Sequence, residues 1–214
     1  NKTVYIYFHN LLLVSFSLNF SSPYSLCLNF LKAQYIKFFN KGSYNWITQT
    51  DYSRSLISKK LNINRNLIKV FPFFDISDIP FIERNFNSNK LNYLCVTSNS
   101  RHKNISRLIK AFLKADFSSN KQVNLLITTS GIDQVNDNKQ VKYLGYLNRQ
   151  ELIKEYTESQ YIVIPSMIES FGLPIIEGIA SGANILSSDI ESIKNIAKPS
   201  IKFDPKEEFE IKKG

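Results

Sequence analysis

The stretch IPSMIESFGLPIIEGIASG, residues 164–182, predicts the end of a buried strand, then a loop and a short helix. Pro174 is favourable in the first turn of a helix, so we expect the helix to cover residues 173–181. Seven residues separate Glu169, in the loop, from Glu177, in the helix. Because the first amides of a helix are free to bind an anion, the stretch combines an anion site with two carboxylates.

Short apolar segments alternate with amphipathic segments along the whole chain. We expect strands over residues 3–8, 44–50, 68–74, 93–97, 123–129, 141–145, 161–165, 184–188 and 201–203. We expect helices over residues 26–41, 52–61, 103–115, 148–159, 173–181 and 190–197. Asp51 and Asn148 are the predicted N-caps of the second and fourth of these helices. Such alternation is typical of βαβ units, so the predicted fold class is α/β with parallel sheets that bind ligands at the carboxyl ends of their strands.

A polar segment divides the chain into two predicted units. Residues 75–90, DISDIPFIERNFNSNK, contain Pro80 and show no sustained apolar period. Linkers between domains have this character. We therefore expect one unit over residues 1–75, a linker over 76–90 and a second unit over 91–214.

The composition is that of a globular protein with an excess of basic residues. Of the 214 residues, 43% are hydrophobic and 21% are charged, and the net charge is +9 with a sequence pI of about 9.4. A solvated basic surface explains this charge as well as attraction to phosphate-rich ligands, nucleic acid or an anionic membrane does. Cys27 and Cys95 show neither a disulfide framework nor a metal-binding spacing, so we expect no metal site and a reducing, cytoplasmic setting.

The beginning of the chain is uncharged, because residues 3–31 contain no Lys, Arg, Asp or Glu. A membrane-spanning helix needs about 20 predominantly apolar residues, and polar side chains such as His9, Asn10 and Asn19 interrupt this run. A signal peptide would have an unbroken apolar centre followed by a small-residue cleavage site. We therefore expect a buried strand followed by a partly apolar loop close to a membrane.

Three candidate site residues lie at or just beyond the carboxyl ends of predicted strands. Lys103 follows the strand at 93–97 and lies at the expected start of a helix, where the helix dipole favours phosphate. His9 ends the first strand, at an edge expected to face the second unit. Glu177 is placed to bind vicinal hydroxyls, as acidic residues bind a ribose in other parallel sheets. A surface lysine, a polar cap on the core and a carboxylate favoured by the helix dipole are the alternative interpretations.

Two longer segments resemble a known enzyme family. YLCVTSNSRHKNISRLIKAF, from residue 93, and VKYLGYLNRQELIKEYTESQYIVIPSMIESFGLPIIEGIASGANILSSD, from residue 141, look like retaining glycosyltransferase family 4, the group 1 nucleotide-sugar transferases. Within them, PSMIESFGLPIIEGIASG is close to the family pattern P-S-x-x-E-G-F-G-L-P-x-x-E-A-M-A-x-G. The resemblance covers residues 90–205 and implies a GT-B fold of two Rossmann-like domains. It also implies that the first domain lacks its beginning and the second its last helices.

The resemblance implies roles for individual residues. Glu169, His9 and Lys103 would act at the reacting centre, on the transferred sugar and the diphosphate. The implied donor-binding residues are Glu177, Gly172, Leu173, Phe171, Arg101, Tyr146 and Leu147. Among these, Glu177 would hold the ribose hydroxyls, the amides at the start of the helix would bind the diphosphate, and the nucleobase would lie near residues 145–147.

The sequence departs from the family pattern in three places. Many members carry Gly-Arg, with the Arg on phosphate, where this chain reads about Val96–Thr97. Lys103 would then act alone or with the help of Arg101. Ser170 replaces the usual Gly after the first Glu, and GANI replaces G-V-P-V near the end.

The implied function is transfer of a sugar from a nucleotide-diphosphate donor to a glycan or lipid-linked acceptor, with retention and without a metal or cofactor. A basic, aromatic first unit would suit contact with an anionic membrane from its cytoplasmic side. The alternatives are a GT-B nucleotide-sugar epimerase, an inactive sugar-nucleotide-binding fragment and a basic nucleic-acid binder. Because no base-reading or RNA-binding signature is present, no nucleic-acid partner is expected.

Overall fold

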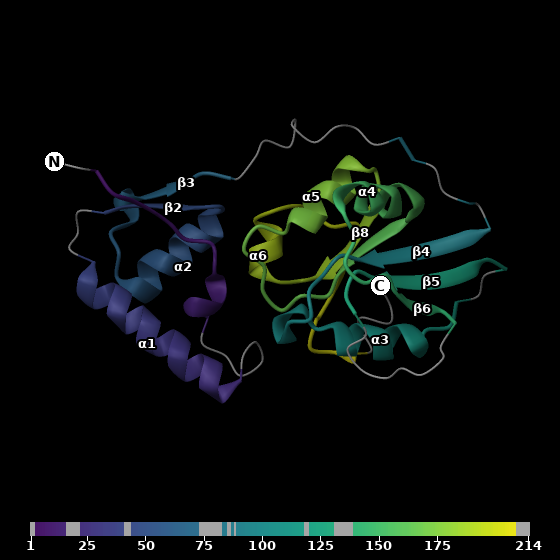
Figure 1. Ribbon diagram of the computed structural model, residues 1–214, viewed down its shortest axis with the longest axis horizontal. Helices are drawn as coiled ribbons and strands as arrows, with labels where there is room; N and C mark the ends of the chain where they lie inside the picture. Colours follow the sequence, from purple (N-terminus) through teal and green to yellow (C-terminus); the bar gives the residue numbers. More distant parts are fainter. Residues whose placement is uncertain are drawn as a thin grey trace.

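The computed structural model describes residues 3–15, 22–40, 44–72, 83, 84, 87, 89–117, 120–130 and 139–208. They form two α/β units, which we call the first unit (residues 3–72) and the second unit (residues 89–208) (Figure 1). The sheets of both units are parallel, so the predicted fold class is confirmed. Most of the predicted linker lies outside the described residues.

The first unit is a small parallel sheet with two helices on one face. Its strands are β1 (Tyr5–Tyr7), β2 (Asn45–Thr48) and β3 (Ile68–Val70), in the spatial order β1-β2-β3. Its helical segments are η1 (Leu11–Leu13), α1 (Pro23–Phe39), α2 (Asp51–Leu61) and η2 (Arg65–Leu67). Because crossovers between parallel strands are right-handed, α1 and α2 lie on the same face of the sheet (Figure 1). Their Ala33 and Ile57 pack there against Trp46 and Ile68, which are register partners on β2 and β3.

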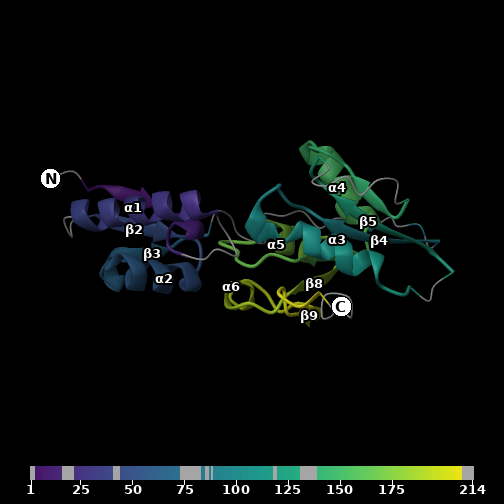
Figure 2. The same ribbon diagram turned by 90° about the horizontal axis from the view of Figure 1, so that it is seen from below.

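The second unit is a doubly wound sheet. Its strands are β4 (Lys90–Cys95), β5 (Gln122–Ile127), β6 (Val141–Tyr143), β7 (Tyr161–Ile164), β8 (Asn184–Ser188) and β9 (Ile201–Phe203). Its helical segments are η4 (Arg101–Lys103), α3 (Ile105–Leu113), α4 (Arg149–Glu158), α5 (Leu173–Ala180) and α6 (Glu191–Lys194). The described strands lie in the order β6-β5-β4-β7-β8-β9, with α3 on one face and α4 and α5 on the other (Figures 1 and 2). The order reverses between β4 and β7, which is where such sheets bind ligands.

Two predicted helix caps have different outcomes. The side chain of Thr50, rather than Asp51, caps α2, because its oxygen accepts a hydrogen bond from the Ser53 amide. Asp51 is instead the first residue of the helix, where the helix dipole favours a carboxylate. Asn148 caps α4 as predicted, in a capping box completed by the Glu151 side chain.

Two predicted helices begin at other residues. Helix α1 starts at Pro23, three residues before the predicted start, with Ser22 as its N-cap. Lys103 is not in the first turn of α3 but in the short 3-10 turn η4, and α3 starts at Ile105. Asn104 between them has a φ of 58°, a left-handed conformation that separates the two helical segments and that Asn tolerates better than most residues.

The two units meet through the loops at the carboxyl ends of their strands. Ile168, in the loop after β7, packs with Phe8 and Leu11 in the core of the first unit. Tyr52 of α2 lies near Glu191 of α6, and burial together with this carboxylate raises the pKa of the Tyr52 phenol. The edge of the second sheet formed by the carboxyl ends of its strands therefore faces the first unit.

Gly178 lies where α5 approaches the sheet, and a Cβ atom there would lie 2.8 Å from side-chain atoms of both Ile162 and Ile185. We expect Gly178→Val to lower the free energy of unfolding by about 2 kcal/mol, because overfilling a packed core typically costs ~1–3 kcal/mol. Equilibrium unfolding in urea, followed by circular dichroism, measures the change. The control Ile179→Val, at an exposed neighbouring position, is expected to change stability by less than about 0.5 kcal/mol. Equal stability of the two variants would contradict the close approach of α5.

Candidate functional site

The two loops at the reversal of strand order carry Lys103 and Glu169, whose side chains form an ion pair. Nζ of Lys103 lies 2.7 Å from Oε1 of Glu169, and the two side chains are only 19% and 8% exposed. The Ser166 hydroxyl donates a 2.6 Å hydrogen bond to the same carboxylate oxygen. The amide of Glu169 donates to the Ser192 hydroxyl at 3.1 Å. Glu169 is therefore fixed through both its backbone and its side chain.

Hydrogen bonds fasten these two loops together. The Met167 amide donates to the His102 carbonyl at 2.8 Å. The side-chain amide of Asn104 donates to the carbonyl oxygens of Pro165, at 3.1 Å, and of Pro205, at 2.8 Å. The loop after β4 is thus held against the loop after β7, which explains how residues distant in the sequence reach one site.

A cavity of about 270 Å³ lies between the two units beside this ion pair. It is lined by His9, Asn10, Leu11 and Leu12 of the first unit and by His102, Lys103, Ile168, Glu169 and Ser170 of the second. His9 is exposed, and its ring stacks on that of Tyr7 with the centroids 6.2 Å apart. The three residues assigned to the reacting centre, His9, Lys103 and Glu169, therefore line the same cavity.

The environment of the pair shifts the pKa values of two neighbouring groups. Burial lowers the pKa of His102, and Lys103 lowers it further, whereas Glu169 raises it. His102 is consequently neutral at pH 7. Burial raises the pKa of the Cys95 thiol, at the end of β4, to about 12, so this thiol stays protonated at neutral pH.

The second carboxylate of the opening stretch, Glu177, has a different partner. Its Oε1 binds the guanidinium of Arg149, whose side chain is 54% exposed although Glu177 itself is buried. Glu177 is the fifth residue of α5 and lies beyond its first turn. Stabilisation by a position in the first turn, one of the interpretations from the sequence, is therefore wrong. Tyr156 lies nearby, and burial together with the Glu177 charge raises the pKa of its phenol well above the usual value.

Sequence reasoning missed three residues that hold the two carboxylates. Arg149 binds Glu177, Ser166 binds the side chain of Glu169, and Ser192 binds its amide. Arg149 occupies the first position of α4, where the helix dipole disfavours a cation, and this was a usable signal that it serves another partner. Ser192 carried no signal, because Glu169 comes near it only in the folded chain. Ser166 lies only three residues before Glu169, but this spacing alone does not show that its hydroxyl binds the carboxylate.

Gly172 sets the start of α5. Its φ is 66°, and a Cβ atom there would lie 2.9 Å from Cδ1 of Ile175 and 3.0 Å from Cδ1 of Ile196. The N-cap position of α5 is Gly172, which has no side chain to bind the first amides of the helix. Anion binding by the amides of Gly172 and Leu173 stays a prediction. The start of α5 has a geometry that suits it.

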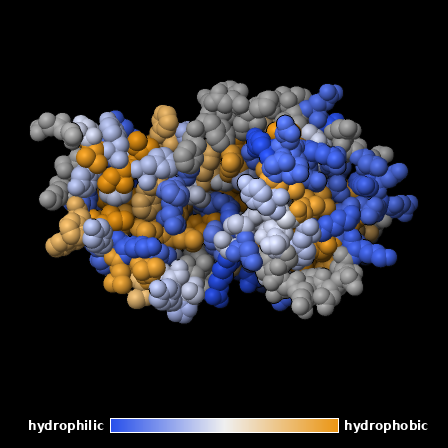
Figure 3. All heavy atoms as spheres, viewed as in Figure 1, coloured by the Kyte–Doolittle hydropathy of each residue, from blue (hydrophilic) through white to orange (hydrophobic). Residues whose placement is uncertain are grey.

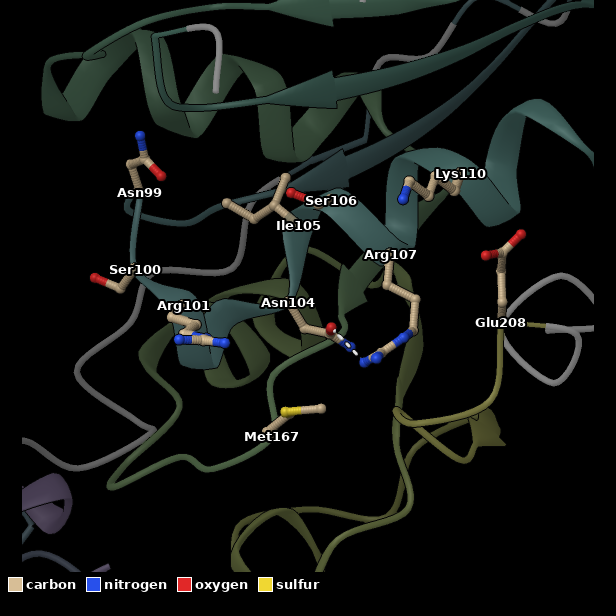
Figure 4. A pocket seen from close by; sticks show the side chains of 10 residues that line it. All are labelled: Asn99, Ser100, Arg101, Asn104, Ile105, Ser106, Arg107, Lys110, Met167 and Glu208. Atoms are coloured by element: carbon tan, nitrogen blue, oxygen red, sulfur yellow. Dashed lines mark hydrogen bonds between the residues drawn. The ribbon is translucent and has the colours of Figure 1, made fainter. Parts of the chain in front are cut away.

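Arg101 lies on the other side of the loop after β4. It lines a separate polar hollow of about 630 Å³, where Arg107 and Lys110 of α3 also point (Figure 4). Arg107 is engaged there by Oδ1 of Asn104, at 2.8 Å. The structure therefore places Arg101 in a different hollow from Lys103, which leaves Lys103 as the cation beside Glu169.

The remaining predicted donor-binding residues lie in loops at the same edge of the sheet. Tyr146 and Leu147 connect β6 to α4, and the Tyr146 side chain is 97% exposed. Phe171 is half-buried and directly precedes Gly172. Because Arg149 begins α4 directly after the predicted nucleobase loop, its ion pair with Glu177 joins the start of α4 to the middle of α5.

The chain is similar in sequence to several glycosyltransferases. A family model described as "Glycosyl transferases group 1" matches residues 78–203. The O-antigen chain mannosyltransferase B of Escherichia coli is 34% identical over 56 residues, which are 26% of this chain and 15% of that protein. An uncharacterized glycosyltransferase of Methanocaldococcus jannaschii is 33% identical over 61 residues, 28% of this chain and 16% of that protein.

Solved structures resemble almost the whole chain in fold. Anabaena Alr3699/HepE, in complex with UDP and glucose, has a TM-score of 0.75 at 15% identity, and the match covers 99% of this chain and 60% of that one. TarM has a TM-score of 0.74 at 18% identity, over 100% of this chain and 42% of that one. Sucrose-phosphate synthase from Thermosynechococcus elongatus has a TM-score of 0.72 at 15% identity, over 98% and 56%. These likenesses show the GT-B fold, and the chain spans between 42% and 60% of these three structures and a sixth or less of the curated relatives.

The reactivity of the two cysteines tests whether the thiol at the end of β4, beneath the site, is buried. Cys27 is exposed, whereas Cys95 is buried with its pKa raised to about 12, so little of its reactive thiolate form exists at pH 8. We expect a disulfide reagent such as dithionitrobenzoate to modify one thiol per native chain and both thiols in urea. In Cys27→Ser, the native protein is expected not to react. Rapid reaction of that variant would show that Cys95 is accessible.

Proposed function

Because the chain belongs to the group 1 family of glycosyl transferases, we propose that it transfers a sugar from a nucleotide-diphosphate donor to a glycan or lipid-linked acceptor, with retention of configuration. The observation that carries this proposal is the Lys103–Glu169 pair, which lines the cavity between the units together with His9. A cation and a carboxylate side by side can bind a phosphate and a sugar hydroxyl of the same ligand.

In this proposal the donor lies along the carboxyl edge of the second sheet. The ribose hydroxyls bind Glu177, and the diphosphate binds the amides of Gly172 and Leu173 at the start of α5. The sugar reaches the cavity, where Oε2 of Glu169 is the oxygen available to a hydroxyl, since both described side-chain donors bind Oε1. His9 contacts the sugar from the first unit.

The chemistry that this arrangement supports is departure of the nucleoside diphosphate. Breaking the bond between the sugar and the diphosphate places developing negative charge on a phosphate oxygen. Lys103 has three donors, so its ammonium can bind that oxygen while it keeps Glu169 as a partner. A preorganised donor aimed at developing charge contributes ~3 kcal/mol to such a step. We assign the role of neutralising this charge to Lys103, the cation that lies beside Glu169 in the cavity.

The two ion pairs are expected to respond differently when the donor binds. The Arg149 side chain is half exposed and can move into solvent at little cost, whereas Lys103 is mostly buried. We propose that a ribose displaces or joins Arg149 on Glu177, and that the Lys103–Glu169 pair stays intact when the donor binds. Breaking the buried pair would leave an uncompensated charge, which is the more costly exchange.

We propose that the acceptor is a cell-envelope glycan assembled at the cytoplasmic side of a membrane. Similar proteins include the O-antigen mannosyltransferase, and a solved relative with a TM-score of 0.60 is described as involved in lipopolysaccharide biosynthesis. Donors to compare are UDP-glucose and UDP-GlcNAc, since two solved relatives hold UDP with glucose or GlcNAc, and GDP-mannose, a mannosyl donor.

A GT-B nucleotide-sugar epimerase is the second candidate, because it shares the fold and the donor. The experiment that separates the two functions is product analysis with and without an acceptor. A transferase leaves the donor sugar unchanged in configuration when no acceptor is present and attaches it to a glycan when one is added. Interconversion of the donor sugar without acceptor would overturn the proposed transfer.

The role of Glu177 predicts a defect in donor affinity. We expect Glu177→Ala to raise the dissociation constant of the best nucleotide sugar by about 10- to 100-fold, because hydrogen bonds to a charged group contribute ~1.5–3 kcal/mol. Thermal unfolding over a range of donor concentrations measures this affinity, since a ligand of the native state raises its stability. Glu207 is exposed and lies outside the site, so the control Glu207→Ala is expected to retain wild-type affinity. Unchanged affinity of Glu177→Ala would show that the ribose does not bind this carboxylate.

The role of Lys103 predicts a defect in turnover. We expect Lys103→Met to lower kcat by about 100- to 1,000-fold, as removal of one donor to developing charge does in other enzymes. Steady-state transfer, measured at saturating donor with the retained anomer identified by NMR, tests this. Lys154→Met, on α4 and exposed, is the matched control with the same loss of charge. Equal rates for the two variants would show that Lys103 does not act on the leaving group.

A further inference from the structure

Helix α1 of the first unit carries a continuous exposed apolar stripe. Its members recur at alternating spacings of four and three residues, which places them on one side of a helix. The stripe consists of Tyr24, Leu28, Leu31, Tyr35 and Phe38. Each of these side chains is between 39% and 82% exposed. An exposed, contiguous apolar patch of this kind marks an interaction surface.

The stripe points away from the body of the protein. Ala33 is the buried residue of α1 and packs in the core of the first unit. At about 100° per residue, Ala33 lies on the side of the helix opposite the centre of the stripe. The helix therefore uses its small residue to pack on the unit and presents its large aromatic and aliphatic side chains outward. Figure 3 shows hydrophobic residues gathered over the first unit, whereas the visible face of the second is mostly hydrophilic.

The charge of the first unit indicates the chemistry of the partner. Nine of the 27 Lys and Arg residues but one of the 18 Asp and Glu residues lie in residues 1–72, so this third of the sequence carries eight of the nine net positive charges. Within α1 there is no acidic residue, and Lys32 and Lys37 are both exposed. A surface with exposed aromatic side chains on a strongly basic unit is complementary to anionic lipid headgroups over an apolar layer.

Two other uses of the stripe fit these observations less well. No described helix has the length and apolar character needed to cross a membrane. Pairing of α1 with α1 of a second copy would bring two strongly basic units together, and their mutual repulsion opposes the contact. An anionic surface would instead attract the basic first unit.

We infer that the exposed face of α1 is a docking surface for an anionic lipid bilayer, with the helix lying in the plane of the interface. The inference rests on the proposed function, because it supplies the surface on which a lipid-linked acceptor would be found. A hydrogen bond of 3.3 Å from the Asn29 side chain of α1 to the Leu12 carbonyl joins this helix to η1, which lines the cavity of His9. The N-terminal end of helix α1 is the end that lies nearer the second unit (Figures 1 and 2). Docking through α1 thus holds the cavity close to the bilayer.

The test is sedimentation of the protein with vesicles of phosphatidylcholine, with and without about one-third phosphatidylglycerol. We expect binding to the anionic vesicles and little to the neutral ones, weakening as salt is raised. Tyr35→Ser/Phe38→Ser is expected to lower the partition coefficient at least tenfold. Lys32→Glu/Lys37→Glu is expected to lower it by at least as much, since each lysine near such a surface contributes about fivefold. Lys198→Glu/Lys202→Glu, the same charge change on the exposed surface of the second unit, serves as the matched control and should retain binding.

Three further measurements keep the outcomes distinct. Circular dichroism and donor-dependent thermal stabilisation are expected to match wild type in all variants, so failure of donor binding concerns the proposed transfer and not the docking surface. Loss of vesicle binding in the control to the same degree as in the α1 variants would show that net charge alone, and not this face, is responsible. Absence of vesicle binding, or a dimer in analytical ultracentrifugation that the Tyr35→Ser/Phe38→Ser variant dissociates, would overturn the inference.

Discussion

The buried ion pair between Lys103 and Glu169 is the interaction on which the arrangement of the site depends. It exists because the strand order reverses between β4 and β7, which sends the following loops to opposite sides of one crevice. Removing two charges from water costs about as much as their attraction returns, so such a pair adds little net stability, whereas loss of one partner costs ~3–5 kcal/mol. The proposed role in ligand binding therefore accounts for the pair better than a contribution to stability does. It is a preorganised charge at the place where a doubly wound sheet binds its ligand.

Each carboxylate of the opening stretch has its own cation, and this decides how the two work together. Glu169 is bound by Lys103, and Glu177 by Arg149 from a different helix. Two carboxylates that share a proton lie against each other, whereas here each carboxylate binds a separate cation. The close packing of α5 through Gly178 keeps Glu177 at the sheet, one helix turn and a loop away from Glu169. The pair is thus suited to hold two parts of one extended ligand.

The sequence predicted the elements that follow from local chemistry and missed the contacts that depend on folding. Strands β8 and β9 were predicted to the residue, because apolar runs and turn residues bound them closely. The family resemblance placed Lys103 and Glu169 at the same reacting centre, and both follow strands whose carboxyl ends share an edge. Thr50 and Asp51 are both residues that commonly cap helices, and only the backbone conformation of the folded chain shows that Thr50 is the N-cap. The bond of Ser192 to Glu169 depends on the packing of separate strands and has no local signature.

The position of the excess charge changes its interpretation. The cations beside the candidate donor site, Lys103 and Arg149, are each neutralised by a glutamate, and the second two-thirds of the sequence is nearly neutral overall. In the proposed function, donor recognition therefore uses single, placed charges and does not depend on the net charge of the chain. The eight net positive charges of residues 1–72 act over a longer range, where they are screened within about 10 Å by salt and add up only over an extended anionic surface. A sequence pI of about 9.4 thus reflects the composition of the first third of the sequence and not that of the remainder.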